Sequence, residues 1–335
     1  MSKILLAHGG GGREMHELLR ELFSIVRKTK VGNEIGLDES DDGASLTING
    51  RIVISTDSYT VSPIFFPGGN IGKLAAAGSI NDVAVMGAEP IAALDGLIVE
   101  EGLPLAELKE IIKSLVTTFE AENVALIAGD FKVMPRGKID KIVINTTVIG
   151  TVKDHIITDS GAKPGDKVIV SGTIGEHGAT ILALQIGIDA EKENLKSDCE
   201  PITRIMRIAK EIAKIHAAKD PTRGGLAMTL NEIAEKSGVR IDVDEEYIPI
   251  RENVRALCEM LGVDPLWLAC EGRVVLVVSG DVAEDVVDSL RSAGYKDASI
   301  IGEVRKGKPY VVLKTLSGGL RLLEKPTGEI VPRIC

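Results

Sequence analysis

The chain ends in a cysteine, Cys335, which follows Pro332, Arg333 and Ile334. Chain termini are poorly ordered unless another part of the protein holds them, so a terminal thiol is not expected in a core. The residues from Ser317 onward mix glycines, prolines and charges of alternating sign, which is typical of a mobile tail. A nucleophilic sulfur on such a tail could carry a small group covalently between sites. An exposed thiol without a role is the alternative, and the tail alone does not separate the two.

Several aspartates in the first half of the chain stand at comparable positions. Asp57 and Asp130 each follow an apolar run that predicts a strand, and Asp82 lies in a helix-like stretch. Asp41 and Asp42 form an acidic loop before a glycine. Acids at strand ends converge at the edge of a sheet where ligands bind, and carboxylates suit Mg²⁺ that carries nucleotide phosphates. A solvated loop acid or helix cap is the favoured interpretation of any single aspartate, but several together indicate a site.

The second half of the chain adds two candidate positions. Asp220 and Arg223 belong to the stretch Asp-Pro-Thr-Arg-Gly-Gly, which precedes a predicted helix. Arginine and glycines at a helix start predict an anion site. Glu271 stands between apolar segments, just before a predicted buried strand. Partial burial would raise its pKa and suit it to proton transfer; a salt-bridged residue at the start of the strand is the alternative.

Two glycine-rich stretches were compared with nucleotide-binding loops. Residues 68–74 resemble a phosphate loop, but the first glycine is one residue too close to Gly72 and Lys73, and Leu74 replaces the required serine or threonine. Residues 8–12, His-Gly-Gly-Gly-Gly, follow a short apolar run. Their backbone N–H groups could wrap a phosphate, and a flexible N-terminal linker is an equally good interpretation.

Composition limits the class of protein. The formal net charge of −10 disfavours nucleic acid as a partner. No apolar run approaches the roughly 20 residues that span a bilayer, and the N-terminus lacks the features of a signal peptide, so we expect a cytoplasmic protein without a membrane segment. The four cysteines form no Cys-x-x-Cys pair and are expected to be reduced, with Cys258 and Cys270 packed in a core. The five histidines show no metal-ligand spacing.

Apolar periodicity predicts two domains of similar size with mixed sheets, of α/β or α+β class. A charged, turn-rich stretch over 153–166 marks the boundary between them. The first half is predicted to contain strands at 51–55, 91–99, 124–128 and 141–150, and helices at 69–86 and 105–122. The second half is predicted to contain strands at 167–171, 240–243, 273–278, 299–304 and 310–313, and helices at 179–185, 201–216, 225–236, 251–261 and 282–290.

These motifs together closely resemble the HypE family of hydrogenase maturation factors, over essentially the whole chain. The terminal Pro-Arg-Ile-Cys is the most specific part of the resemblance. The aspartate motifs are shared more widely, with aminoimidazole ribonucleotide synthetase, selenophosphate synthetase and thiamine monophosphate kinase. The segments that carry the resemblance are 8–12, 42–44, 55–57, 68–90, 129–130, 220–225 and 332–335.

The resemblance implies a mixed α+β fold of the aminoimidazole ribonucleotide synthetase type. Residues 1–40 are expected to form an N-terminal arm with the glycine-rich segment. Residues 41–152 are expected to form an ATP-binding domain whose strands make a barrel in a homodimer. Residues 153–316 are expected to form a C-terminal α+β domain, and residues 317–335 a flexible tail that ends in the carrier cysteine.

The resemblance also implies a reaction. The partner HypF loads a carbamoyl group onto the terminal cysteine, and the enzyme uses ATP with Mg²⁺ to dehydrate the thiocarboxamide to a thiocyanate. The cyanide then passes to iron held by a HypC–HypD complex, for the nickel–iron hydrogenase site. Phosphorylation of the amide oxygen explains the need for ATP, because an amide oxygen is otherwise a very poor leaving group, and Mg²⁺ would neutralise charge during the transfer.

Roles for individual residues follow from the same resemblance. Cys335 is the carrier, and Lys132 and Glu271 are expected to remove the nitrogen protons. Asp57, Asp82 and Asp130 are the candidates for binding Mg²⁺ and phosphate. The remaining candidates for contact with the nucleotide are Asp42, Asn81, Asp220 and Arg223.

One position departs from the family pattern, and two alternatives remain. Phe131 stands where the family commonly has threonine, so one contact to the nucleotide is expected to be absent. Another ATP-using synthetase or kinase of the superfamily is one alternative, although selenophosphate synthetase would need a cysteine or selenocysteine in the glycine-rich stretch. A non-catalytic thiol carrier or iron-delivery scaffold is the other, and it would show no ATPase activity.

Overall fold

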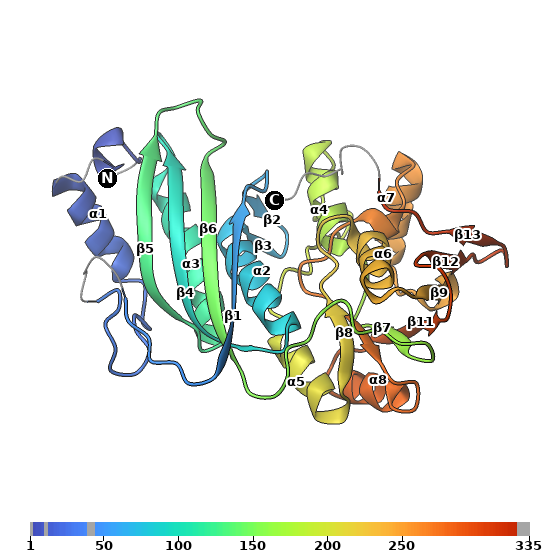
Figure 1. Cartoon of the computed structure of the whole chain (residues 1–335). Coiled ribbons are helices and arrows are strands. Elements are labelled where there is room, and N and C mark those ends of the chain that lie inside the picture. The colour runs from blue at the N-terminus through green and yellow to red at the C-terminus, as the bar shows by residue number, and fades with distance from the viewer. Residues whose placement is uncertain (1–2, 10–12, 39–43, 327–335) are drawn as a thin grey trace.

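The computed structural model describes residues 3–9, 13–38 and 44–326, which form two α+β domains side by side (Figure 1). The N-terminal domain contains a four-stranded sheet in the order β1-β6-β4-β5. Only β4 and β5 pair in parallel, so the predicted mixed sheet is confirmed. The strands are β1 (Arg51–Tyr59), β4 (Glu89–Glu100), β5 (Ala125–Met134) and β6 (Ile142–Val152).

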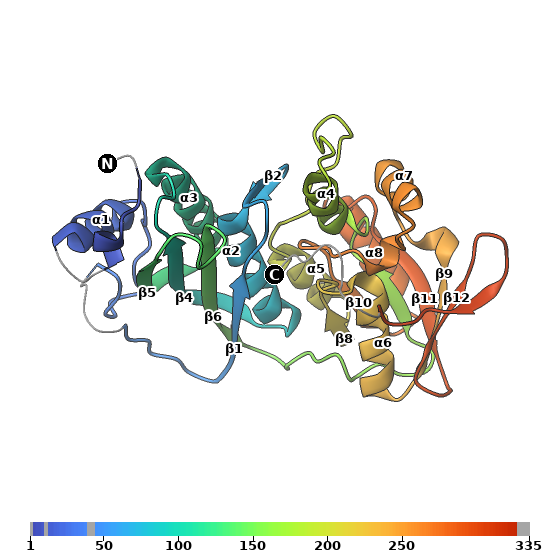
Figure 2. The same cartoon turned by 90° about the horizontal axis from the view of Figure 1, so that it is seen from above.

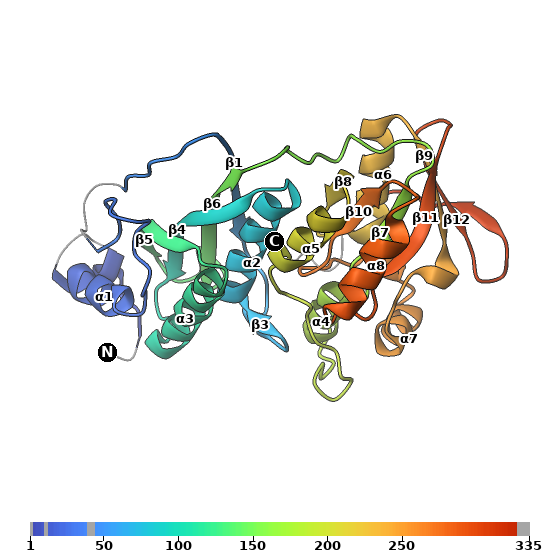
Figure 3. The same ribbon diagram turned by 90° about the horizontal axis from the view of Figure 1, so that it is seen from below.

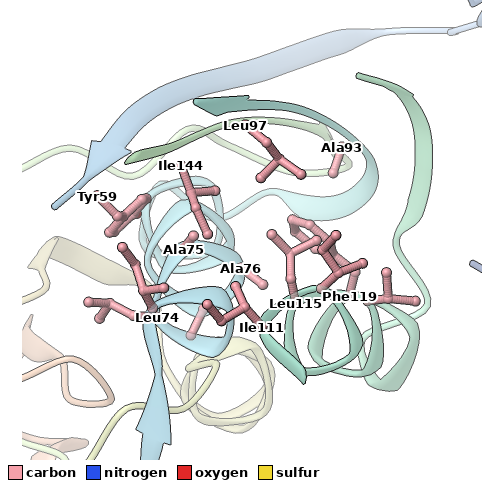
Figure 4. Packing of buried hydrophobic residues seen from close by; sticks show 14 of the residues in the cluster. Tyr59, Leu74, Ala75, Ala76, Ala93, Leu97, Ile111, Leu115, Phe119 and Ile144 are labelled. Carbon is pink, nitrogen blue, oxygen red and sulfur yellow. The ribbon is translucent and has the colours of Figure 1, made fainter. Parts of the chain in front are cut away.

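Helices α2 (Ile71–Val85) and α3 (Leu105–Ala121) cover one face of this sheet. Figure 4 shows Ala75 and Ala76 of α2 beneath the sheet, with Ile111 and Leu115 of the neighbouring α3 beside them. Asn70 caps α2 by accepting hydrogen bonds from the N–H groups of Gly72 and Lys73. A Cβ atom on Gly72 would lie 2.0 Å from the Ile111 carbonyl oxygen, so the glycine that resembles part of a phosphate loop allows the two helices to pack closely.

The opposite face of the sheet is only partly covered within one chain. Val31, Ala44 and Leu46 pack over Ala92, Ala125 and Ile127. Along β6 every second residue is buried, as expected for a strand with one face on a core. Farther along the uncovered face, the large apolar side chains that remain exposed are Ile52, Ile54, Ile98 and Met134.

The C-terminal domain contains a seven-stranded sheet in the order β13-β12-β9-β11-β7-β10-β8. Its strands are β7 (Lys167–Val170), β8 (Ile215–Lys219), β9 (Arg240–Asp244), β10 (Val275–Val278), β11 (Ser299–Arg305), β12 (Val311–Lys314) and β13 (Leu320–Leu322). Its helices are α4 (Glu176–Gln185), α5 (Thr203–Ile212), α6 (Gly225–Ser237), α7 (Glu252–Leu261) and α8 (Ala283–Ser292). Helix α6 packs on one face of the sheet and α5 with α8 on the other, so every residue of β10 is buried.

The two domains meet at α2 and α5, and an extended linker joins them (Figures 2 and 3). Ala84 and Val85 of α2 belong to the apolar cluster that contains α5 and α8. Arg207 of α5 makes a bidentate ion pair with Glu89 of β4, with its shortest N–O distance 2.8 Å. These contacts fix the N-terminal sheet against the C-terminal domain, and the candidate site lies along the same boundary.

Three segments differ from the sequence predictions. The expected N-terminal arm contains a helix, α1 (Arg13–Phe23), and Leu18 and Leu22 belong to the core of the N-terminal domain. The helix predicted over 201–216 ends at Ile212, and β8 begins at Ile215. The predictions missed β8 because no glycine or proline separates it from α5, whereas α1 begins directly after the glycines at 9–12, which were a usable boundary signal.

The third difference concerns the predicted tail. Residues 320–322 form β13, which pairs antiparallel with β12, and Leu323 is 1% exposed. The Leu323 N–H donates to the Val311 carbonyl, and its own carbonyl accepts from Asn231. The chain is therefore held to the domain beyond residue 317, because one face of this segment buries Leu323. Residues 327–335, which include Cys335, lie outside the described residues, and within the described ranges no helix is long and apolar enough to cross a membrane.

Candidate active site

A polar cavity of about 360 Å³ lies between the two domains. The N-terminal domain lines it from β1 and α2, and the C-terminal domain from the turn after β8, from α6 and from the segment before β10. Its N-terminal lining is Thr56, Asp57, Tyr59, Gly78 and Asp82, and its C-terminal lining is Lys219, Asp220, Thr222, Arg223, Glu232 and Glu271. Asp57, Asp82, Asp220, Arg223 and Glu271 were sequence candidates, and the structure brings these five together.

The two N-terminal acids come from neighbouring elements. Strand β1 turns Ser55, Asp57 and Tyr59 toward α2, because alternate residues of a strand share a face. The Ser55 hydroxyl donates to Asp82 at 2.7 Å, which fixes the Asp82 carboxylate beside β1. The sequence predicted Asp57 at the end of its strand. In the structure β1 continues beyond it to Tyr59.

The C-terminal domain contributes charges of both signs. Asp220 directly follows β8, and the Arg223 guanidinium lies 4.0 Å from Asp57 across the cavity. Lys219 lies 3.2 Å from Glu232 of α6. Sequence reasoning missed Lys219 and Glu232. The position of Lys219 next to Asp220 was a usable signal, whereas Glu232 reaches the cavity only through the packing of α6.

Burial and crowding of acids change the protonation of this cluster. Burial and the Asp82 carboxylate raise the pKa of Asp220 to about 7. Burial and Asp57 raise the pKa of Asp82, although the hydrogen bond from Ser55 opposes the shift. Unneutralised carboxylates in a shared cavity repel one another, and this excess of negative charge is what a bound cation would relieve.

Glu271 is 5% exposed, so the expectation that it is desolvated is confirmed. Burial raises its pKa well above the usual range, and the carboxylates of Asp198 and Asp220 add to the shift. The raised pKa favours the protonated, neutral form of the Glu271 side chain. In that form it is a proton donor at the edge of a cavity whose other acids can bind a cation.

The carboxylates of the cavity suit an Mg²⁺ ion that is also bound to a phosphate ligand better than one bound by protein side chains alone. Within the described ranges, no group of three or more acidic, histidine or cysteine side chains is arranged to hold a metal by itself. Mg²⁺ is usually bound by one or two carboxylates, with water and substrate phosphates as its other ligands. Asp57, Asp82 and Asp220 supply such carboxylates. Asp42 lies outside the described residues.

Asn81 lines no part of the cavity. Its side chain is 1% exposed and bonds to three main-chain groups of the C-terminal domain, at Glu200, Ile202 and Glu271. Its amide is therefore committed to protein contacts and does not face the nucleotide candidates, contrary to the expectation.

Asp130 and Lys132 are also absent from the cavity. They lie in the middle of β5, at the edge of the sheet opposite β1, and Lys132 donates to Asp130 at 2.5 Å. This contact lowers the pKa of Asp130. The set Asp57, Asp82 and Asp130 is thus not assembled within one chain, because β6 and β4 separate β5 from β1. The sequence does not reveal this strand order. The cavity brings Asp220 together with Asp57 and Asp82 instead.

The described cysteines are packed thiols. Cys199, Cys258 and Cys270 are free and buried, which confirms the expectation for Cys258 and Cys270. Burial raises the pKa of all three thiols, to about 11 for Cys258. A thiol with so high a pKa and no access is a poor nucleophile, so none of the three is suited to carry a group. The terminal Cys335 is the remaining cysteine of the sequence.

Known proteins share this arrangement of domains. Residues 40–152 and 163–314 match the AIR synthase related protein families for the N-terminal and C-terminal domains, respectively. Carbamoyl dehydratase HypE of Escherichia coli (strain K12) is 42% identical over 349 aligned positions, which cover 100% of both chains. The chain belongs to the HypE family. The fold expected from the resemblance is thereby confirmed.

Solved HypE structures agree with the fold described above. A crystal structure of hydrogenase maturation protein HypE in complex with ATP has a TM-score of 0.92 and 39% identity, covering 99% of each chain. HypE from a crystal structure of a HypE–HypF complex has a TM-score of 0.78 and 38% identity, covering 94% of this chain and 100% of the other. These HypE structures therefore match both domains rather than one of them.

Proposed function

We propose that this chain is an ATP-dependent carbamoyl dehydratase that converts an S-carbamoyl group on Cys335 to a thiocyanate. The observation that carries the proposal is the cavity between the domains, which combines the acids Asp57, Asp82 and Asp220 with the buried carboxyl group of Glu271, whose pKa is raised. The acids suit the phosphates of a magnesium nucleotide. The family name and the ATP-bound HypE structure support the assignment.

The chemistry requires two steps. The carbamoyl oxygen attacks the γ-phosphorus of ATP, ADP leaves, and one nitrogen proton is released to solvent. The carbon–oxygen bond of the phosphorylated intermediate then breaks, phosphate leaves, and loss of the second nitrogen proton forms the carbon–nitrogen triple bond. Mg²⁺ held by the nucleotide phosphates and by one or two carboxylates of the set Asp57, Asp82 and Asp220 would neutralise phosphate charge.

The raised pKa of Glu271 suits the second step. In its protonated form the side chain can donate a proton to the departing phosphate oxygen, and the carboxylate formed can accept the remaining nitrogen proton. The side chain returns to its starting state, so a single group relays the proton between the two atoms. Burial raises the pKa of Glu271, and a raised pKa is what allows a glutamate to donate a proton near neutral pH.

The length of the terminal segment permits Cys335 to reach this cavity. Lys325, close to the end of the described chain, pairs with Glu235 of α6 at 2.6 Å. Glu232, about one helical turn earlier on α6, lines the cavity. The residues 327–335 can span about 30 Å when extended, which is ample for a path that starts on the helix that lines the cavity.

The proposed partners come from the family and from the uncovered sheet. A relative is crystallised as a HypE–HypF complex, which supports HypF as the donor of the carbamoyl group. The family resemblance alone adds a HypC–HypD complex as the acceptor of the cyanide. The exposed apolar side chains Ile52, Ile54, Ile98 and Met134 fit a homodimer that pairs two sheets.

Intact mass spectrometry tests the proposed reaction. Full-length protein carrying an S-carbamoyl group on Cys335 is mixed with Mg-ATP, and the expected result is the loss of one water per chain. An unchanged mass in protein that binds ATP would refute the dehydratase assignment. Asp82→Asn is the matched variant, since it weakens the acidic site and should slow the loss of water.

The alternative is a thiol carrier without catalytic activity. ATP hydrolysis separates the two, because a carrier has none and its Asp82→Asn variant would behave as the parent. The acidic cavity favours the enzyme, because a carrier has no use for three buried or half-buried carboxylates between its domains.

A further inference from the structure

The main chain of Glu271 is held from both sides by buried polar side chains. One of them, Asn81, belongs to the N-terminal domain, and the other, Asp198, belongs to the C-terminal domain. Neither side chain lines the cavity. Their contacts bear on the proposed function because Glu271 is the group to which it assigns proton transfer.

Asn81 holds the carbonyl side of the Glu271 segment. Its Nδ2 donates to the Glu271 carbonyl at 3.1 Å and to the Glu200 carbonyl at 3.2 Å. Its Oδ1 accepts from the Ile202 N–H at 2.8 Å. Both amide protons and the amide oxygen therefore have partners, all from the C-terminal domain. Asn81 also directly precedes Asp82 in α2, so the residue that contacts Glu271 is covalently joined to an acid of the cavity.

Asp198 holds the N–H side of the same segment. Its two carboxylate oxygens accept from the N–H groups of Glu271 and Gly272, at 3.1 Å and 3.2 Å. Its side chain is 0% exposed and lies 3.7 Å from the Arg273 guanidinium, which in turn pairs with Glu176 at 2.6 Å. A Cβ atom on Gly272 would lie 2.0 Å from the Asp198 carbonyl oxygen, so the two segments are in close contact along their backbones.

We infer that Asn81 and Asp198 are positioning residues that fix the Glu271 carboxyl group relative to Asp82 and the phosphates it would bind. This inference rests on the proposed function. A proton relay between a nitrogen and a phosphate oxygen requires heavy atoms within hydrogen-bond reach of both. The two halves of the cavity belong to different domains, and Asn81 is the side chain that bonds directly from the helix of Asp82 to the backbone of Glu271.

Asp198 has a second effect, because it is an acid close to Glu271. After burial, its charge is the first contributor to the raised pKa of Glu271. Replacing Asp198 with asparagine should therefore lower the pKa of Glu271 and restrict its protonated form to lower pH. The charged and titratable groups around Glu271 that would remain are Asp57, Tyr59, Asp82, Cys199, Lys219, Asp220, Arg223, Glu232 and Arg273.

The experiment measures dehydration of full-length, carbamoylated protein by the rate of water loss at varied ATP concentration and pH. Asn81→Ala should lower kcat by about 100-fold, because a displacement of about 1 Å can have that effect, and should change KM for ATP far less. Asp198→Asn should move the alkaline limb of the pH profile to lower pH by about one unit. Asn81→Ala should leave that limb in place.

Arg207→Ala is the matched control, since it removes an ion pair between the domains without contacting Glu271. It should retain kcat within a few-fold. Equal losses in Arg207→Ala and Asn81→Ala would overturn the role of Asn81 by showing that a general loosening of the boundary is responsible. The role of Asp198 would be overturned if Asp198→Asn left both the alkaline limb of the pH profile and kcat unchanged. Because this variant is nearly isosteric, it tests the positioning of Glu271 even if Asn81→Ala does not fold. A parent protein that never loses water would instead refute the proposed function.

Discussion

Asp57 and Asp130 lie on opposite faces and at opposite edges of the same four-stranded sheet. Asp57 is level with Gly129 across the strands, in a row that faces α2, whereas Asp130 is level with Ser58 in the next row. Neighbouring rows point to opposite faces, and three strand spacings separate β1 from β5 by about 14 Å. Asp130 and Lys132 therefore cannot join the cavity of their own chain without rearrangement of the sheet.

A test in mixed dimers follows from this relationship. If Lys132 acts with Glu271, as the family resemblance implies, the two must come from different copies of the chain. Lys132→Ala and Glu271→Gln should each be inactive alone. Mixed after subunit exchange, they should regain up to about a quarter of the parent activity per site, because half of the chains enter mixed dimers and each mixed dimer has one intact site.

The control for that experiment pairs two changes in one cavity. Asp82→Asn mixed with Glu271→Gln should regain activity only if both residues act from different chains, and the structure places both in one cavity. Recovery in this pair, or none with Lys132→Ala, would contradict the arrangement. Dehydration rates of the mixtures, measured by intact mass, provide the comparison.

The sequence predicted the elements with strong periodicity. The apolar spacing from Leu108 to Phe119 predicted α3, and the alternation from Ile142 onward predicted β6, because each pattern reflects a single buried face. Strand order carries no such signal. Asp57 and Asp130 have similar local sequences after an apolar run, and only the insertion of β6 and β4 between their strands separates them in space.

The candidate site was predictable in part for the same reason. Asp82, Asp220 and Glu271 were found from the residue type and its neighbours, and they do share a cavity. The family resemblance placed Asn81, the neighbour of Asp82, among the candidates for contact with the nucleotide. In a helix, adjacent residues point about 100° apart, so the neighbour of a cavity residue can face the other domain, as Asn81 does.

The stability of the ligand-free protein should depend on the pH through Asp220. Its pKa is about 7 in the folded protein against an ordinary value of 3.8. The folded state thus binds this proton more tightly than the unfolded state, and the stabilisation present below about pH 4 is lost as the pH rises toward 7. We expect a decrease of a few kcal/mol in the free energy of unfolding over this range, measured by urea denaturation.

Asp220→Asn isolates this contribution from the other titrating groups. The amide cannot titrate, so the variant should lose less stability than the parent between pH 4 and pH 7. Asp281→Asn is a matched control, because Asp281 is an exposed acid whose pKa is lowered by its hydrogen bond from Ser279. Parallel curves for the parent and Asp220→Asn would show that Asp220 does not hold its proton in the folded state.

Gly72→Ala should separate α2 from α3. The new Cβ atom would lie 2.0 Å from the Ile111 carbonyl oxygen, a main-chain atom that cannot move aside alone. Overpacking of this kind costs about 1–3 kcal/mol, and displacement of α2 would also move Asp82. Gly96→Ala is the control, since its Cβ would meet no atom nearer than the Asn145 Cβ at 3.9 Å. Thermal unfolding compares the two, and equal melting temperatures would contradict the packing argument.

Cys335→Ser tests whether the carrier and the nucleotide site are separate. Among the described residues, those that line the cavity fall between 56 and 271, and the chain is held to α6 by Lys325 before the terminal segment begins. The variant should therefore bind Mg-ATP with the affinity of the parent, measured by calorimetry. It should form no thiocyanate, because an oxygen in place of the sulfur removes the nucleophile that accepts the carbamoyl group.

Deletion of residues 327–335 should give the same two results. A loss of ATP affinity in both variants would mean that the terminal segment forms part of the nucleotide site, whereas thiocyanate formed by Cys335→Ser would place the carrier at another cysteine, against the burial of Cys199, Cys258 and Cys270.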